Sequence, residues 1–119
     1  MYCAKYSIDT GGINMDTQMK RGVLDVCVLT ALMKEDSYGY KIIKDLKDVI
    51  EISESTLYPI LRRLEKNGYL SVYTQEHNFR LRKMYSITEK GLERIKEYLE
   101  DLEELMKIYR YIQKETGND

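Results

Sequence analysis

The sequence predicts a mainly α-helical fold with a small β-hairpin: a winged helix-turn-helix followed by a long C-terminal dimerisation helix. Two stretches carry this prediction. Between Ser53 and Leu70, apolar residues recur at helical spacing, and an Asn-Gly pair then leads into the alternation typical of a strand. From Glu89 to Gln113, apolar residues follow a seven-residue repeat. With 119 residues, 43% of them hydrophobic and 33% charged, the chain can form one domain with a modest core.

We divide the chain into three parts. Residues 1–15 are expected to form a flexible N-terminal arm, 16–87 the winged helix-turn-helix and 88–114 the dimerisation helix. The first 14 residues show no clear period and contain Gly11-Gly12. They are either an arm of the natural product or sequence upstream of a start at Met15 or Met19.

Charge is distributed unevenly along the chain, although the total is only −1. From Glu54 to Lys83 there are six cations against three anions, whereas from Thr88 to Glu115 there are six against eight. A positive middle and a negative C-terminal part favour a local phosphate-binding surface.

Composition argues against several other functions. Cys3 and Cys27 do not make a disulfide framework, so we expect reduced thiols and a cytoplasmic protein. The apolar run from Val23 to Met33 is too short to span a bilayer, which needs roughly 20 residues. His77 is the single histidine, so we expect no metal site and no cofactor. No nucleophile with a base and no glycine-rich phosphate loop is evident, so we expect no enzyme.

The first helix is expected from Asp16 to Lys34. It is apolar on more than one face, which favours contact with its own core and with a second subunit. A central helix in a monomer would show the same pattern.

A second helix is expected from Tyr38 to Lys47, with Ser37 as its N-cap. Its buried stripe is expected to comprise Tyr40, Ile43, Leu46 and Val49. The first turn of this helix, with its free amides and Tyr38, is suited to bind a phosphate.

The third helix has two contrasting faces. Its expected buried stripe is Leu57, Ile60, Leu61 and Leu64. The opposite face carries hydroxyls, an aromatic tip and cations: Ser55, Thr56, Tyr58, Arg62, Arg63 and Lys66. Ser53 or Ser55 is expected to cap the start, Pro59 is tolerated near the first turn, and Asn67-Gly68 ends the helix. This face suits a DNA groove, but a solvated face on an ordinary helix would look the same.

A hairpin is expected after the third helix. Its strands are 69–74 and 81–87, and residues 75–80 form a polar tip. Arg82 and Met84 should point to one side of the second strand, and Leu81, Lys83 and Tyr85 to the other. The cations Arg80, Arg82 and Lys83 favour a wing that lies along a DNA backbone or in a minor groove. Cations also protect sheet edges from aggregation, which is the alternative interpretation.

The last helix is expected from Glu89 to about Gln113, with Thr88 as its cap. Its heptad seam comprises Leu92, Ile95, Leu99, Leu102, Met106 and Tyr109, and Ile108 and Ile112 widen it. So long a seam extends beyond a small domain, and a homodimer is the simplest way to bury it. Folding back onto the first helix is the alternative.

Four motifs point to one family. They are Arg21–Asp25 (RGVLD), Tyr38–Tyr40 (YGY), Thr56–Glu65 (TLYPILRRLE) with Asn67-Gly68, and Lys83–Gly91 (KMYSITEKG). Because it contains these motifs in this order, the sequence resembles the PadR family of bacterial and archaeal winged-helix transcriptional regulators. The resemblance covers about Lys20 to Leu92, and the string LYPxLxxLE followed by YxxTxxG is its specific part.

The resemblance implies a homodimer that binds a partly palindromic operator and usually represses transcription. A single C-terminal helix is similar to the short-tailed PadR subgroup, some of whose members bind flat aromatic effectors in a pore between subunits. The sequence contains no Trp, and Leu102 stands where those members carry a stacking Trp. In this sequence, an aromatic wall for such an effector pore would have to come from Tyr98, Tyr109 or Tyr111.

We therefore expect a dimeric repressor that binds operator DNA and is released by a small effector at the dimer interface. The expected DNA contacts are Tyr38, Lys41, Ser55, Thr56, Tyr58, Arg62, Arg63, Lys66, Arg80 and Arg82. The alternative is a winged-helix protein-interaction module that binds no DNA, which the near-neutral charge favours.

Overall fold

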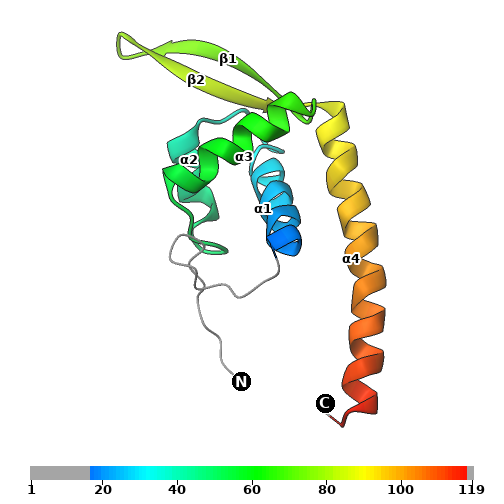
Figure 1. Cartoon of the computed structure of the whole chain (residues 1–119). Coiled ribbons are helices and arrows are strands. Elements are labelled where there is room, and N and C mark those ends of the chain that lie inside the picture. The colour runs from blue at the N-terminus through cyan, green and yellow to red at the C-terminus, as the bar shows by residue number, and fades with distance from the viewer. Residues whose placement is uncertain (1–16, 118–119) are drawn as a thin grey trace.

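The computed structural model describes residues 17–117, and Figure 1 shows their arrangement. The elements in chain order are α1 (Thr17–Ala31), α2 (Gly39–Leu46), α3 (Glu54–Lys66), β1 (Leu70–His77), β2 (Arg80–Ile87) and α4 (Glu89–Glu115). This order confirms the predicted fold class. The arm predicted at residues 1–15 lies outside the described residues.

The molecule is elongated, with extents of 60 × 30 × 22 Å. Helices α1, α2 and α3 pack together, and the hairpin lies across one end of them (Figure 1). Helix α4 runs beside α1 and continues well past it (Figure 1). With 27 residues α4 is about 40 Å long.

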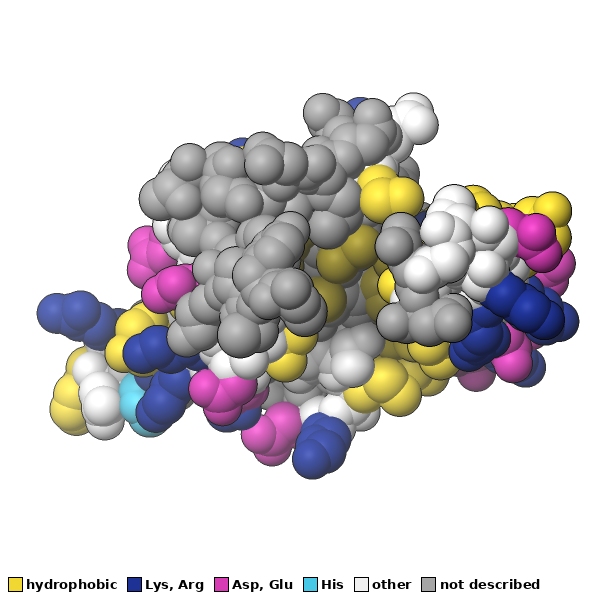
Figure 2. Space-filling view, turned by 90° about the horizontal axis from the view of Figure 1, so that it is seen from below, with side chains coloured by type: hydrophobic (Ala, Val, Ile, Leu, Met, Phe, Trp, Pro, Cys, Tyr) yellow, Lys and Arg dark blue, Asp and Glu magenta, His cyan; other side chains and the backbone are white. Residues whose placement is uncertain are grey.

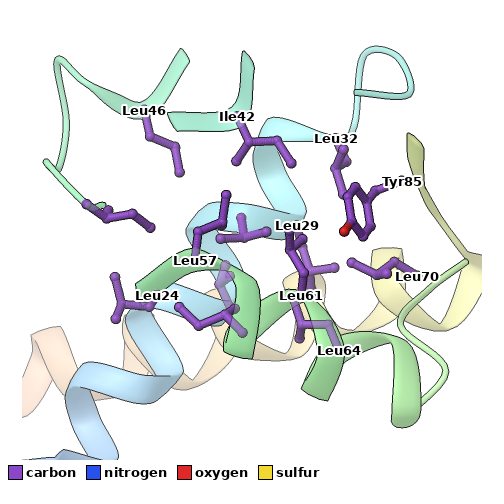
Figure 3. Packing of buried hydrophobic residues seen from close by; sticks show 14 of the residues in the cluster. Leu24, Leu29, Leu32, Ile42, Leu46, Leu57, Leu61, Leu64, Leu70 and Tyr85 are labelled. Atoms are coloured by element: carbon purple, nitrogen blue, oxygen red, sulfur yellow. The ribbon is translucent and has the colours of Figure 1, made fainter. Parts of the chain in front are cut away.

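The core lies where α1, α2 and α3 meet the base of the hairpin (Figure 3). Its most deeply buried side chains are Val28, Leu29, Leu32, Ile42, Leu57, Leu61 and Leu64. Tyr85 of β2 and Ile95 of α4 extend this cluster toward the hairpin and the last helix. A single core therefore fixes α3, the hairpin and the first turns of α4 relative to one another.

Helix α1 ends at Ala31, three residues before the predicted Lys34. The chain then tightens, because the amides of Leu32 and Met33 bond to carbonyls three residues back rather than four. This leaves Leu32 buried at the end of the helix.

The predicted cap of α2 was wrong. Ser37 is buried, and its backbone pairs with Tyr85 of β2 through N–O distances of 3.1 and 2.7 Å. A residue held against a sheet edge in this way is not free to cap the helix, and Tyr38 occupies the N-cap without a side-chain hydrogen bond.

The predicted buried stripe of α2 was right for Leu46 and for Ile43, which packs partly buried against the core, but wrong for Tyr40 and Val49. Tyr40 and Val49 are 65% and 74% exposed, whereas Ile42 is fully buried and Leu46 nearly so. The buried stripe begins with Gly39. A search for apolar side chains at helical spacing misses this position, because glycine has no side chain. Tyr58 of α3 packs over Gly39, and a β-carbon at position 39 would collide with its hydroxyl.

Helix α3 follows the prediction closely. Leu57, Ile60, Leu61 and Leu64 are all buried. Ser53 caps the helix, accepting a hydrogen bond from the Thr56 amide at 3.4 Å. Gly68, with φ of +81°, ends it in the left-handed conformation expected after Asn67. Pro59 is the sixth residue, in the second turn of the helix, and lies on the exposed face.

The hairpin is longer than predicted and its turn is tighter. The antiparallel register runs from Leu70 opposite Ile87 to His77 opposite Arg80. Only Asn78 and Phe79 form the turn, both with positive φ. The polar residues predicted as a loop belong to the strands, because exposed strands do not require apolar side chains.

Thr88 joins the hairpin to α4. Its hydroxyl accepts a hydrogen bond from the Gly91 amide at 3.1 Å, as predicted for a cap, and donates one to the Gly68 carbonyl at 2.7 Å. Gly91 is buried, and a β-carbon there would collide with the Tyr69 carbonyl. Hairpin and α4 therefore share a closely packed junction.

Candidate nucleic-acid interface

The outer face of α3 is polar and partly cationic. Ser55, Arg62 and Lys66 are exposed, and Thr56 is half-buried beside the cap. The buried stripe on the opposite side fixes the rotation of α3, so these side chains must point away from the core. We refer to Ser55, Thr56, Arg62 and Lys66 as the reading face.

Arg63 lies elsewhere. Its guanidinium donates a hydrogen bond to the carboxylate of Asp25 on α1, and the two side chains are 30% and 18% exposed. Burial raises the pKa of Asp25, and the hydrogen bond and charge of Arg63 oppose that rise. The prediction placed Arg63 at a DNA backbone, but in this structure it joins α3 to α1.

Tyr58, another predicted contact, is half-buried between α3 and α2, where it covers Gly39. It therefore has a packing role that the sequence pattern did not reveal.

Lys41 sits in an acidic environment. Its Nζ lies 2.9 Å from Asp45 Oδ2 and 3.4 Å from Glu35 Oε2. The hydrogen bond to Asp45 raises the pKa of Lys41, and Glu35 adds to the rise. Because both carboxylates are exposed, these pairs are weak and a phosphate can compete for the ammonium group.

The start of α2 and the wing meet at Tyr38 and Arg82. The Arg82 guanidinium lies 3.8 Å from the centroid of the Tyr38 ring, a cation–π contact. Two residues that were predicted separately as DNA contacts are thus brought together. Tyr73 of β1 adds a second link, since its hydroxyl donates a 2.6 Å hydrogen bond to Asp36, which also raises the pKa of Tyr73.

Toward its tip the wing carries Arg80 and His77 opposite each other on one face, with Arg82 and Gln75 as the next pair. Lys83 lies on the other face, as strand alternation requires. Among the predicted wing contacts, Arg80 is exposed and Arg82 half-buried.

The predicted dimerisation seam divides into two parts. Ile95 is 7% exposed and belongs to the core of its own chain, so including it in the seam was wrong. The remaining members are 37–57% exposed: Leu92, Leu99, Leu102, Met106 and Tyr109. Leu105, Ile108, Tyr111 and Ile112 are exposed as well, so the apolar surface of α4 is broader than a two-residue heptad seam.

Other kinds of site are not evident in the described part of the chain. Residues 17–117 contain no cluster of three or more His, Cys, Asp or Glu side chains that could hold a metal ion. The helices among these residues include none that is long and apolar enough to cross a membrane.

Comparison with known proteins decides the family. The model of the transcriptional regulator PadR-like family matches residues 28–97. The chain belongs to the PadR family. The match runs from α1 to the first turns of α4, and therefore contains the reading face and the whole wing.

Individual relatives are similar over most of the chain. An uncharacterized protein of Lysinibacillus sphaericus is 31% identical over 93 residues, which are 74% of this chain and 85% of that protein. A transcriptional regulator from Clostridium thermocellum is 35% identical, with a TM-score of 0.72, over 80% of this chain and 97% of its own. A PadR-like transcription factor from Bacteroides fragilis is 35% identical, with a TM-score of 0.73, over 81% of this chain and 95% of its own.

One similar structure contains DNA. It is Bacillus subtilis PadR in complex with operator DNA, 27% identical with a TM-score of 0.61. The similarity covers 65% of the present PadR-like chain and 46% of that protein. The predicted resemblance to PadR regulators is thus confirmed, and the fold it implied is the fold observed.

Proposed function

We propose that this PadR-like chain is a homodimeric repressor that binds a partly palindromic operator, with one winged helix-turn-helix in each half-site. The observation that carries the proposal is the reading face, which presents hydroxyls and cations on a helix whose rotation is fixed by a buried apolar stripe. The operator complex of Bacillus subtilis PadR supports DNA as the partner.

In this proposal α3 enters the major groove. Ser55, Thr56 and Arg62 lie nearest the bases, and Lys66 meets a phosphate. The Tyr38–Arg82 pair, Lys41 and Arg80 hold the adjacent backbone and groove. Arg63 and Tyr58 act indirectly, because they position α3 against α1 and α2.

The dimer is proposed to form through the exposed apolar residues of α4. A two-fold axis there would hold two reading faces about one helical turn of DNA apart, roughly 34 Å. Because the operator is chromosomal, we place this function in the cytoplasm.

A surface hollow of about 210 Å³ between α1 and α4 supports the effector part of the proposal. Its lining includes Met19, Gly22, Tyr98 and Leu102 together with Arg94 and Asp101. Seen from below, hydrophobic side chains gather beside the far end of α4 (Figure 2). A small molecule bound in this hollow would change the orientation of α4 relative to α1, and with it the separation of the two reading faces.

The test uses Arg62→Ala. Operator fragments are first selected from genomic DNA with the wild-type protein, and affinity is then measured by gel shift at several salt concentrations. We expect the variant to bind roughly tenfold or more weakly, because one lost arginine contact costs about 1–3 kcal/mol. Lys47→Ala is the matched control, since Lys47 is an exposed cation directly after α2 and is not among the proposed DNA contacts.

Unchanged binding by Arg62→Ala would refute the reading face. Wild-type affinity that does not fall with rising salt would favour the protein-interaction module instead, because phosphate contacts release counterions. A reporter gene placed behind the selected operator, compared with and without the protein, tests repression directly.

A further inference from the structure

The tip of the wing holds an aromatic side chain in an unfavourable position. Phe79 is 96% exposed, the highest value among the exposed large hydrophobic residues. It also has a φ of +65° in the two-residue turn, next to Asn78 at +52°. Such turns favour glycine or asparagine at these positions, and a bulky residue with positive φ is strained. Neither solvent exposure nor backbone geometry therefore accounts for phenylalanine here.

The surroundings of Phe79 are cationic. Arg80 follows it directly, and Arg82 lies further along the same face of β2. Phe79 is thus an exposed apolar side chain with positively charged neighbours.

The base of the wing is fixed, so its tip is held in a defined place. Tyr73 is hydrogen-bonded to Asp36, Arg82 stacks on Tyr38, and Thr88 bonds to Gly68 at the junction with α4. From this base the tip projects beyond the helices (Figure 1). It lies on the same end of the molecule as the start of α2, which carries Tyr38.

We propose that Phe79 is a wedge that enters the minor groove beside each half-site, partly unstacks a base step and bends the operator. The inference rests on the proposed function. Proteins that insert an apolar wedge in this way commonly use Phe or Leu, with cations that bind the flanking phosphates. Arg80 and Arg82 supply that charge, and it complements DNA rather than an apolar protein surface.

The test compares wild type with Phe79→Gly on the operator duplex selected with the wild-type protein. Glycine adopts positive φ without strain, so the variant is expected to remain folded and at least as stable as wild type. Bending is measured by energy transfer between dyes at the duplex ends, and unstacking by the fluorescence of 2-aminopurine placed at adenines outside each half-site.

We expect Phe79→Gly to bind about tenfold more weakly, since stacking of an aromatic residue on a base is typically worth about that much. The bend and the 2-aminopurine signal should both be lost. Phe79→Leu should retain most of both, because leucine can also act as a wedge. Val49→Ala, which trims a 74% exposed apolar residue on the loop after α2, should match wild type.

The wedge is refuted if wild type binds the duplex without bending it or without a 2-aminopurine signal. It is also refuted if Phe79→Gly bends the DNA as wild type does. These outcomes differ from failure of the proposed function, in which wild type selects no duplex at all.

Discussion

Gly39 shows how a single residue can determine which face of a helix is buried. It is the first residue of α2, and the Tyr58 ring of α3 occupies the space where a side chain would be. The close approach lets Ile42 and Leu46 reach the core, and it turns Tyr40 outward. The YGY motif is therefore a packing feature as well as part of the proposed phosphate-binding turn.

We predict that Gly39→Ala destabilises the fold by about 1–3 kcal/mol, the usual cost of overpacking. The β-carbon would collide with the Tyr58 hydroxyl and ring, so either α2 or Tyr58 must move. Urea unfolding at fixed protein concentration measures the change in the free energy of unfolding.

Gly22→Ala is the matched control for this substitution. Gly22 lies within α1, where a β-carbon would be 3.8 Å from the nearest atom of Tyr98, an ordinary contact. Alanine there should stabilise the helix by about 0.5–1 kcal/mol. If Gly39→Ala also proves neutral or stabilising, Tyr58 does not fix the position of α2.

At the scale of elements, the Asp25–Arg63 pair connects α1 to α3. Helix α1 lines the hollow beside α4, and α3 carries the reading face. The pair is thus a direct polar link between helix α1 of the proposed effector region and helix α3 of the proposed DNA-binding surface. Two charges removed from water in this way fix geometry more than they add stability.

The raised pKa of Asp25 leads to a prediction about pH. Because burial favours the protonated carboxyl, this group contributes most to stability below its ordinary pKa of 3.8. That contribution is lost as pH rises through the raised value. The stability of wild type relative to Asp25→Asn should therefore decrease as the pH rises from about 4 to about 7.

Urea unfolding of both proteins across this range measures the shift, and carbon NMR of the Asp25 carboxyl gives its midpoint directly. Asp36→Asn serves as the control, because it makes the same substitution at an exposed carboxylate. A difference that instead grows in favour of wild type with rising pH would mean that the ion pair outweighs the burial of Asp25.

The elements that were predicted well are those whose signals are local. In α3 the apolar stripe, the Ser53 cap and the Asn67-Gly68 end all lie within one short stretch. The Thr88 cap of α4 is equally local. Each of these features needs only neighbouring residues, and each appears in the structure.

The features that were missed depend on contacts between distant segments. Ser37 was taken as a cap because its pairing with Tyr85 is not visible in the local sequence. In the sequence, Arg63 looked like one more exposed cation. The available signal was Asp25, because a carboxylate within the apolar run of α1 needs a cationic partner, and that partner is Arg63. Ile95 fits the heptad repeat, and only the packing of α4 against the core removes it from the seam.

For the whole molecule, α4 has two successive roles. Its first turns complete the core through Gly91 and Ile95. Beyond them the helix runs beside α1 and then past it, and it carries exposed leucine, isoleucine, methionine and tyrosine side chains along its length. So much apolar surface on a charged helix is typical of an interface, and the proposed homodimer would bury it.

The last prediction tests this interface with Leu99→Asp. Leu99 is 57% exposed and lies one heptad after Leu92, so the change leaves the core of the subunit intact. In a two-fold interface it buries two unpaired charges. Because an unpaired buried charge costs about 3–5 kcal/mol, the dimer dissociation constant should rise at least about a hundredfold.

Sedimentation equilibrium measures the dissociation constant, and circular dichroism checks that the subunit stays folded. Lys96→Asp is the control, since Lys96 is exposed one turn earlier and lies outside the seam; it should sediment as wild type does. Because two linked reading faces bind one operator far more tightly than one, Leu99→Asp should also lose operator affinity although its reading face is unchanged. A Leu99→Asp protein that remains dimeric would place the interface on another surface of the molecule.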